Sequence, residues 1–213
     1  MKYSMNLITK RKRDTSDSAS RWGLRKLIFI LLVVFLIFCN NQPIKAFELF
    51  GHRFTTAPSI LFYVDSTAME YDESISYGFS FWNGHNSNVK IDRTYTKSYS
   101  RVDCYWQKLP YAHYQYAVTF HILNNSRVEP TLSDWYWCQI YFNSELYNYA
   151  SLTYNQRKAE ACHELGHVWG LADDNTDVRQ IMCTGFGRDS SIITPQWQDI
   201  YGLGFIYPDI NLG

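Results

Sequence analysis

The sequence predicts a single α+β domain over residues 47–213, and three observations support this fold class. The expected elements follow the order strand, helix, several strands, helix, loop and helix. Such partial segregation of strands and helices is typical of α+β domains. No period of 20–50 residues recurs, and no Gly/Ser-rich or Pro-rich linker divides the stretch. Its length also suits one domain.

The first two elements are indicated by apolar patterning. Residues 59–65 (SILFYVD) form an apolar run with the length of a strand. An apolar stripe at helical spacing follows, made of Tyr71, Ile75, Phe79 and Trp82. We expect that helix to end at Gly84.

Three further strands are expected in the middle of the domain. Residues 89–95 alternate in polarity, and residues 135–143 (WYWCQIYFN) form an aromatic strand. Between them lies a stretch whose alternate residues are apolar and share one face: Tyr116, Val118, Phe120 and Ile122.

Capping signals delimit two helices in the last third of the chain. Thr153 and Gln156 have the spacing of a capping box and open a helix that runs toward Gly170. Thr194 and Pro195 resemble a cap followed by a first-turn proline. The apolar stripe expected for that last helix comprises Trp197, Ile200, Tyr201 and Phe205.

Composition argues against a disordered chain and, when residues 1–46 and 47–213 are counted separately, against a nucleic-acid-binding domain. Apolar residues make up 46% of the sequence and charged residues 19%, which excludes a disordered chain. The formal net charge is zero, but residues 1–46 hold nine basic and two acidic residues, a balance of +7. Residues 47–213 therefore hold 11 basic and 18 acidic residues, a balance of −7. Such an acidic domain does not suit a nucleic-acid partner.

The N-terminal segment resembles a secretion signal. Residues 27–39 (LIFILLVVFLIFC) are thirteen residues without a charge, and they follow Arg25 and Lys26. This length fits the apolar region of a signal peptide better than a membrane span, which needs about 20 residues. We expect cleavage after Ala46 and secretion of residues 47–213, so that the chain meets the membrane only transiently. An uncleaved N-terminal anchor is the alternative.

A metal-binding pattern lies on the expected helix that begins near Thr153. His163 and His167 are four residues apart, so their imidazoles share one face of a helix and can bind one ion. Glu164 lies beside them and has the chemistry of a general base. Taken alone, this pattern fits either a zinc site or two surface histidines beside a solvated glutamate.

The residues after this helix extend the pattern. Gly170 is placed to end the helix in a left-handed conformation. Asp173 then supplies a carboxylate as third ligand, and two histidines with one carboxylate are a catalytic zinc arrangement. Asp174, next in sequence, and Asp199 are the competing third ligands. Met182 follows in a short stretch, 181–183.

Residues 163–174 (HELGHVWGLADD) followed by Met182 resemble the metzincin clan of zinc endopeptidases, whose motif is HExxHxxGxxH or HExxHxxGxxD followed by a Met-turn. Within the clan the chain is similar to small secreted matrixin-like and snapalysin-like proteases, over roughly residues 57–208. The resemblance implies a single catalytic domain with a twisted mixed sheet, an active-site helix, a Met-turn and a C-terminal helix.

The resemblance also implies the role of each site residue. One catalytic zinc is held by His163, His167 and Asp173, and Glu164 takes a proton from the zinc-bound water during peptide hydrolysis. Met182 forms an apolar floor beneath the histidines. Some relatives have a tyrosine as extra ligand two residues after this methionine, but here that residue is Thr184.

Two further expectations concern the acidic residues after the helix and the remaining histidines. A structural Ca²⁺ is a further expectation, at an acidic cluster of Asp173, Asp174 and Asp177, although an ordinary acidic loop is the simpler interpretation for the last two. The remaining histidines of residues 47–213 are expected to be solvated: His52, His85, His113 and His121.

Four cysteines remain after the expected signal, and in an exported chain they predict up to two disulfides. Cys162 precedes His163 and Cys183 follows Met182, so the Cys162–Cys183 pair would tie the metal helix to the Met-turn. Cys104 would then pair with Cys138. One pair remaining as buried thiols is the alternative.

The resemblance implies a monomer whose partners are polypeptide substrates, bound in extended conformation along an edge strand. Residues 138–143 best match that strand, and residues 184–193 are expected to line the pocket beyond the scissile bond. The acidic domain favours basic or neutral polypeptides. Two other functions compete with a secreted protease: a catalytically silent binding module, and a membrane-anchored surface protein. The intact Glu164 argues against the silent module.

Overall fold

A six-stranded mixed sheet forms the centre of the computed structural model, which describes residues 47–55, 59–85, 89–110, 114–185 and 187–208. The strands lie in the order β2-β1-β3-β6-β4-β5. Their bounds are Ser59–Val64 (β1), Lys90–Arg93 (β2), Val102–Gln107 (β3), Ala117–Leu123 (β4), Ser126–Val128 (β5) and Trp137–Asn143 (β6). The first four strands in this order run parallel, whereas β4 is antiparallel to β6 and β5 is antiparallel to β4.

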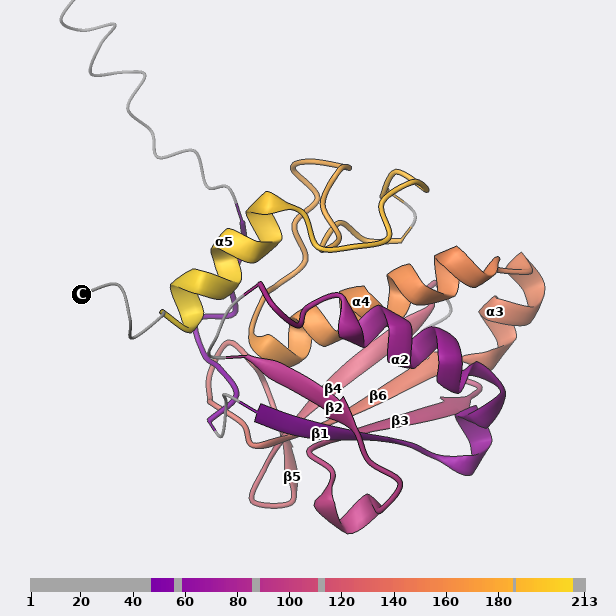
Figure 1. Ribbon diagram of the computed structural model, residues 1–213, viewed down its shortest axis with the longest axis horizontal. Coiled ribbons are helices and arrows are strands. Elements are labelled where there is room, and N and C mark those ends of the chain that lie inside the picture. Colours follow the sequence, from indigo (N-terminus) through magenta and orange to yellow (C-terminus); the bar gives the residue numbers. More distant parts are fainter. Residues whose placement is uncertain (1–46, 56–58, 86–88, 111–113, 186, 209–213) are drawn as a thin grey trace, which may run out of the picture. The chain divides into compact units, whose positions relative to one another are not determined.

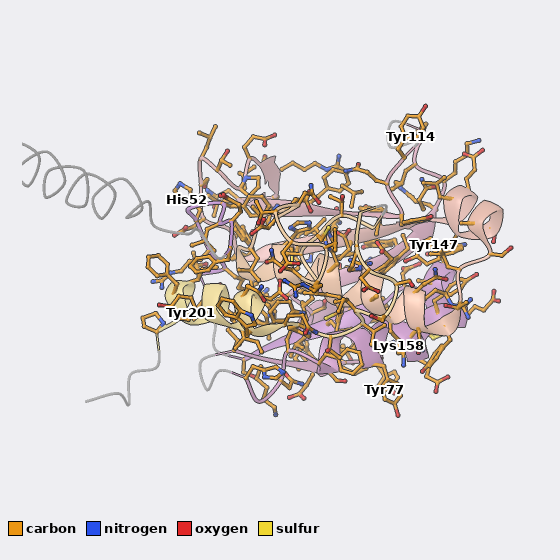
Figure 2. All side chains as sticks on the ribbon, turned by 90° about the horizontal axis from the view of Figure 1, so that it is seen from above. His52, Tyr77, Tyr114, Tyr147, Lys158 and Tyr201 are labelled. Carbon is orange, nitrogen blue, oxygen red and sulfur yellow. The ribbon has the colours of Figure 1, made fainter. Side chains whose placement is uncertain are left out.

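The helices complete the fold. Their bounds are Asp72–Ser80 (α2), Ser144–Ala150 (α3), Tyr154–Trp169 (α4) and Trp197–Ile206 (α5), with 3-10 turns at Ser66–Tyr71 and Lys97–Tyr99. Helices α2 and α4 pack against each other and lie over the same face of the sheet (Figure 1). In this helix pair, Lys158 of α4 lies over the ring of Tyr77 of α2, with Nζ 5.7 Å from the ring centroid (Figure 2). A mixed sheet with helices confirms the predicted α+β class.

The chain divides into two units, Met1–Ile44 and Lys45–Gly213, and only the second is described further. The expected signal peptide and its apolar residues 27–39 lie outside the described residues. None of the helices within the described ranges combines the length and hydropathy of a membrane span.

Most expected elements of residues 47–213 are present. Strands β1, β2, β4 and β6 and helices α2, α4 and α5 lie near the positions that apolar patterning and capping signals predicted. Helix α2, however, ends at Ser80 rather than at the predicted Gly84, and Trp82 lies in the turn that follows it. Sequence patterning missed β3, β5 and the short helix α3. Strand β5 and helix α3 are only three and seven residues long, too short for a clear periodicity. Strand β3 does alternate, with Val102, Cys104 and Trp106 on one face, so its sequence carried a strand signal that was overlooked.

The core anchors helix α4 through tryptophans. Trp82 and Trp135 are fully buried, and their indole N–H groups donate to backbone carbonyls of α4. The acceptors are the carbonyls of Cys162, at 2.8 Å, and of Val168, at 3.0 Å. Each buried indole thus satisfies its polar atom while fixing the helix that carries the metal motif.

The prediction that residues 138–143 form the edge strand is wrong. They belong to β6, which is paired on one side with β3 and on the other with β4. The strand beside α4 with an open edge is β4, because β5 pairs only with its residues from His121 onward. An apolar, aromatic strand suits a central position, where both of its faces are largely covered.

The last helix differs from its prediction in two ways. Its N-cap is Gln196, which forms a capping box with Asp199, rather than Thr194 with Pro195 in the first turn. The expected apolar stripe faces outward, since Trp197, Tyr201 and Phe205 are 66%, 64% and 70% exposed. The buried side of α5 instead carries Gln198, Asp199, Gly202 and Leu203.

Neither expected disulfide forms, since all four described cysteines are buried free thiols. Cys104 lies opposite Ile140 and Cys138 opposite Val102, so the two cysteines lie diagonally across adjacent strands. Diagonal Cα atoms are about 7–8 Å apart, whereas a disulfide needs about 4.4–6.8 Å. In the second pair Cys162 lies in the hydrophobic core, while the Cys183 thiol donates to Asn175 Oδ1 at 3.4 Å.

Candidate metal centre

Helix α4 is bounded by two local signals that set the position of its histidines. Its N-cap Thr153 accepts from the Gln156 backbone N–H at 3.3 Å, and the Gln156 side chain accepts from the Thr153 N–H at 2.9 Å. The helix ends at Gly170, whose φ of 111° lies in the left-handed region. A side chain there would be strained and would also approach the His52 carbonyl, since a Cβ would lie 2.7 Å from its oxygen.

The last carbonyls of α4, which no further helical turn can satisfy, are bound by the C-cap residue Gly170 and by other parts of the fold. Gly170 N–H donates to the Gly166 and His167 carbonyls, and Trp135 donates to Val168. The His121 ring of β4 donates from Nε2 to the His167 carbonyl at 3.0 Å. The end of the helix that carries the second histidine is therefore tied to the sheet.

Backbone carbonyls determine which ring nitrogens of the two motif histidines carry protons. His163 Nδ1 lies 2.8 Å from the Ile181 carbonyl oxygen, and His167 Nδ1 lies 2.9 Å from that of Leu171. A carbonyl oxygen only accepts, so both Nδ1 atoms donate. In the neutral form of each ring, Nε2 is therefore the nitrogen without a proton, and the two Nε2 atoms lie 3.1 Å apart. Such hydrogen bonds are the usual orienting contacts of metal-binding histidines.

Asp173 completes a triangle of ligand atoms. Its Oδ1 lies 3.2 Å from His163 Nε2 and 3.5 Å from His167 Nε2. Tetrahedral zinc with bonds of about 2.0–2.2 Å requires ligand atoms about 3.3–3.6 Å apart, which these distances match closely. Three lone-pair acceptors at contact distance repel one another unless a metal ion or a proton lies between them. The donor set therefore fits a zinc ion.

The competing carboxylates have other partners. Asp174 accepts from the Thr176 backbone N–H at 2.9 Å and from its hydroxyl. Asp199 is buried and accepts from the backbone N–H groups of Ile181, Met182 and Gln196. Neither side chain contacts the imidazoles, so Asp173 is the carboxylate that the fold brings to them.

Glu164 lies beside the triangle but is held by a different group. Among the described residues, His163, Glu164 and His167 have possible ligand atoms that lie within 4.8 Å of one another. The hydroxyl of Thr119, on β4, lies 2.6 Å from Glu164 Oε2. The Glu164 carboxyl is 3% exposed and opens onto the same cleft as the imidazoles.

The titration of the site reflects its burial and its charges. Burial raises the pKa of Glu164 above its usual range, although the histidines and Thr119 oppose this effect. Burial alone would lower the pKa of His167, but Asp173 and Glu164 outweigh it and raise the pKa to about 9. Burial is likewise outweighed at Asp173, where hydrogen bonds to His163 and His167 hold the pKa well below its usual range. The site thus favours added positive charge.

Met182 packs beneath the helix segment that separates the histidines. It is 2% exposed, and a Cβ added to Gly166 would overlap its sulfur atom. The close approach requires glycine at position 166, between Glu164 and His167. This position is consistent with the expected apolar floor.

The histidines open into a cleft of about 320 Å³. Residues 114–121 of β4 and its approach line one wall, and Thr184 and Gly185 line another. Phe50 contributes an aromatic wall, with its ring centroid 5.6 Å from that of His167. A separate pocket of about 70 Å³ shares Tyr116, Glu160 and Gly185 with the cleft and is also lined by Arg188 and Ile192. That residues 184–193 form the substrate pocket stays a prediction.

Arg188 and Glu160 form a buried ion pair beside the cleft, with side chains 6% and 7% exposed. Arg188 Nη1 also donates to the carbonyls of Ile181 and Cys183 at 3.0 and 3.2 Å. Ile181 O is the same oxygen that accepts from His163. The ion pair is therefore connected to a metal-site histidine through one backbone group.

One histidine was predicted wrongly. His121 is 4% exposed rather than solvated, because its ring packs 4.2 Å from Trp135 as well as bonding to α4. Burial lowers its pKa to about 4. His52 is half-buried and lies 3.2 Å from Asp134 Oδ1, His85 is exposed, and His113 lies outside the described residues.

Sequence patterning also missed Thr119, Phe50 and the Glu160–Arg188 pair. The alternation of β4 put Thr119 on the same strand face as His121, which is the one signal that pointed to it. Nothing in the sequence around Phe50 indicates its place: it depends on pairing of its backbone N–H with the Gly170 carbonyl, at 3.1 Å.

The acidic loop does not support the expected calcium site. Asp177 is bound by Arg179, with Nε and Nη2 at 3.0 and 2.9 Å from its two oxygens, and Asp174 is bound by Thr176. Within the described part of the chain, the group suited to a metal ion is the one that contains the two histidines.

Comparison with known proteins gives a distant match in structure alone. No family model matches the chain, and no curated protein sequence matches it. Two solved structures of myroilysin are similar. One has 9% sequence identity and a TM-score of 0.45, over 71% of this chain and 93% of the other. The second has 11% identity and a TM-score of 0.49, over 74% and 87%.

Proposed function

We propose that residues 47–213 form a zinc-dependent endopeptidase of the metzincin type, with one zinc ion held by His163, His167 and Asp173. The observation that carries this proposal is the convergence of the two Nε2 atoms and Asp173 Oδ1 at 3.1–3.5 Å. Glu164 lies beside them in a cleft that is open to solvent. Three protein ligands and a neighbouring carboxylate suit a catalytic rather than a structural zinc site.

The reaction is hydrolysis of a peptide bond. When bound, zinc lowers the pKa of a coordinated water toward about 7 and polarises the substrate carbonyl. Glu164 accepts a proton as the water oxygen attacks the carbonyl carbon. It then delivers that proton to the amide nitrogen as the C–N bond breaks, which leaves a carboxylic acid and an amine. The raised pKa of Glu164 suits both steps, because the protonated acid must persist between them.

An extended polypeptide is the substrate that this cleft suits. The open edge of β4 borders the cleft, and its backbone groups can pair with an added strand. Substrate pairing is therefore assigned to β4 in place of residues 138–143. A folded protein would have to present a loop or terminus.

We infer export of this enzyme from the N-terminal segment alone. Its basic start and thirteen apolar residues are typical of a signal peptide, with cleavage after Ala46. N-terminal sequencing of the mature protein tests this inference. A start near Phe47 supports it, and an intact N-terminus supports the membrane-anchored alternative.

The experiment that tests the enzymatic proposal compares the parent protein with Glu164→Gln on a fluorogenic peptide library, with zinc content measured for both. The variant should retain zinc and lose activity by at least about 100-fold, since a general base contributes that much. Glu145→Gln, at an exposed ion pair with Lys108, is the matched control and should keep full activity.

A chelator should abolish the parent's activity, and added zinc should restore it. Activity that survives chelation, or an active Glu164→Gln, contradicts the mechanism. A protein that binds one zinc ion but cleaves no peptide would instead favour the silent binding module.

A further inference from the structure

We propose that Thr119 is a positioning residue for Glu164, one that couples the general base to the strand edge where substrate binds. This inference rests on the proposed peptidase function. It joins two observations about one residue: the contact of its hydroxyl and the direction of its backbone groups.

The hydroxyl contact leaves one carboxylate oxygen for catalysis. Thr119 Oγ1 lies 2.6 Å from Glu164 Oε2 and 3.2 Å from the Glu164 backbone carbonyl. A hydroxyl has one proton to donate, and the shorter contact to a charged acceptor is the stronger. Oε2 is thus engaged, and Oε1 is the oxygen that exchanges a proton with water and the leaving amine.

Threonine suits this role better than a more flexible side chain. Its two heavy atoms on Cβ restrict the first side-chain torsion, particularly within a strand. The hydroxyl is therefore held toward α4 by the backbone of β4. The Glu164 side chain is therefore fixed at its backbone by α4 and at its carboxyl group by Thr119 of β4.

The backbone N–H and C=O groups of Thr119 lie in the plane of the sheet and point toward the open edge of β4. The Asn143 N–H of β6 donates to the Tyr116 carbonyl of the segment leading into β4. Backbone groups of an antiparallel strand alternate in direction, so those of Ala117 and Thr119 point away from β6. Strand β5 pairs with β4 only from His121 onward. Among the described strands none pairs with Thr119 on this side, so its N–H and C=O can pair with an added peptide strand.

A substrate that pairs with this edge would therefore bind the main chain of Thr119. The side chain of the same residue orients the general base, Glu164. Displacement of the strand by a fraction of an ångström moves the Glu164 carboxyl as well. Only Thr119 then lies between the bound substrate and Glu164. This short connection fixes the distance between the scissile bond and the general base.

The test compares Thr119→Val, which removes the hydroxyl at nearly constant shape, with Thr119→Ser, which keeps it. Thr119→Val should lower kcat about 10-fold to 100-fold, as expected when a catalytic group is misplaced, with little change in KM or zinc content. Thr119→Ser should recover most of the lost rate. Thr55→Val, which removes a hydroxyl bound to the Trp135 carbonyl, is the matched control and should not change kcat.

A second measurement does not depend on activity. The unfolding free energies of metal-free parent, Thr119→Val, Glu164→Ala and the double variant form a double-mutant cycle, in which alanine is used because glutamine would still accept from the Thr119 hydroxyl. We expect the double variant to lose less stability than the two single variants lose in sum. Additive losses would overturn the contact, and unchanged kcat in Thr119→Val would overturn its role.

These outcomes separate the inference from the function on which it rests. An inactive parent protein contradicts the proposed function, while the cycle still decides whether Thr119 holds Glu164. An active parent with a fully active Thr119→Val contradicts the inference alone.

Discussion

The backbone of Ile181 binds three side chains at and around His163. Its carbonyl accepts from His163 Nδ1 and Arg188 Nη1, and its N–H donates to Asp199. Three side chains from different elements thus fix one acceptor, and that acceptor determines the tautomer of His163. In the neutral ring, the Nε2 atom that faces Asp173 is therefore the nitrogen with a free lone pair.

A buried carboxyl away from the site provides a pH prediction at the residue scale. Asp103 is 1% exposed, and burial raises its pKa although the Ser100 hydroxyl donates to it at 2.6 Å. Its proton is bound more tightly in the folded than in the unfolded protein, so its contribution to stability falls as the pH rises through its folded pKa.

Asp103→Asn should therefore be at least as stable as the parent at pH 7. Its advantage should shrink as the pH falls toward 3.8, the usual value for this carboxyl. Denaturant unfolding of both proteins between pH 3.5 and about 7 measures this difference. An advantage that grows toward low pH would show that the pKa of Asp103 is lowered by folding.

Individual site residues differ in how far the sequence could identify them. The spacing of His163, Glu164 and His167 is a property of one helix, so it is visible in the sequence. The choice of Asp173 over its neighbour Asp174 depended on a family resemblance. Thr119 was beyond prediction, because its contact depends on how β4 is aligned against α4.

At the scale of elements, α4 is bounded by local signals and held by distant ones. Its capping box and Gly170 are local, and both were predicted. Helix α5 was misjudged at its start because Asp199 caps it while also binding residues 181 and 182. The position of β6 was misjudged because strand order is a tertiary property that an apolar run does not reveal.

The buried Glu160–Arg188 pair connects α4 to the loop after Met182, and its loss is a test at this scale. Glu160→Gln leaves the guanidinium buried without a counter-charge, which should cost about 3–5 kcal/mol of unfolding free energy. Glu145→Gln, at the exposed pair with Lys108, should cost less than about 1 kcal/mol.

Denaturant titrations of the two variants and the parent provide the comparison. Similar small losses for both variants would mean that solvent compensates Arg188 and that the pair does not hold the loop. A loss of zinc affinity that accompanies Glu160→Gln would support the connection to His163 through Ile181.

At the scale of the whole molecule, the charge of the described unit should affect which substrates it meets. Residues 47–213 carry a balance of −7, and Glu129 and Glu160 line the cleft together with the metal-site carboxylates. An acidic surface attracts basic peptides from a distance, and salt screens this attraction.

The value of kcat/KM for a lysine-containing peptide should therefore fall about three- to tenfold as salt rises from about 0.05 to 0.5 M. A peptide with alanine in place of lysine is the control, and its kcat/KM should change much less. Equal salt dependence for the two peptides would contradict electrostatic attraction by the domain.

The central claim is that His163, His167 and Asp173 together hold one metal ion, and zinc titration against a chromophoric chelator tests it most directly. The parent should bind one equivalent of zinc. Asp173→Asn should weaken binding by about 100-fold or more, whereas Asp174→Asn, whose carboxyl is directed to Thr176, should bind like the parent. Unchanged affinity in Asp173→Asn, or a large loss in Asp174→Asn alone, would contradict the claim.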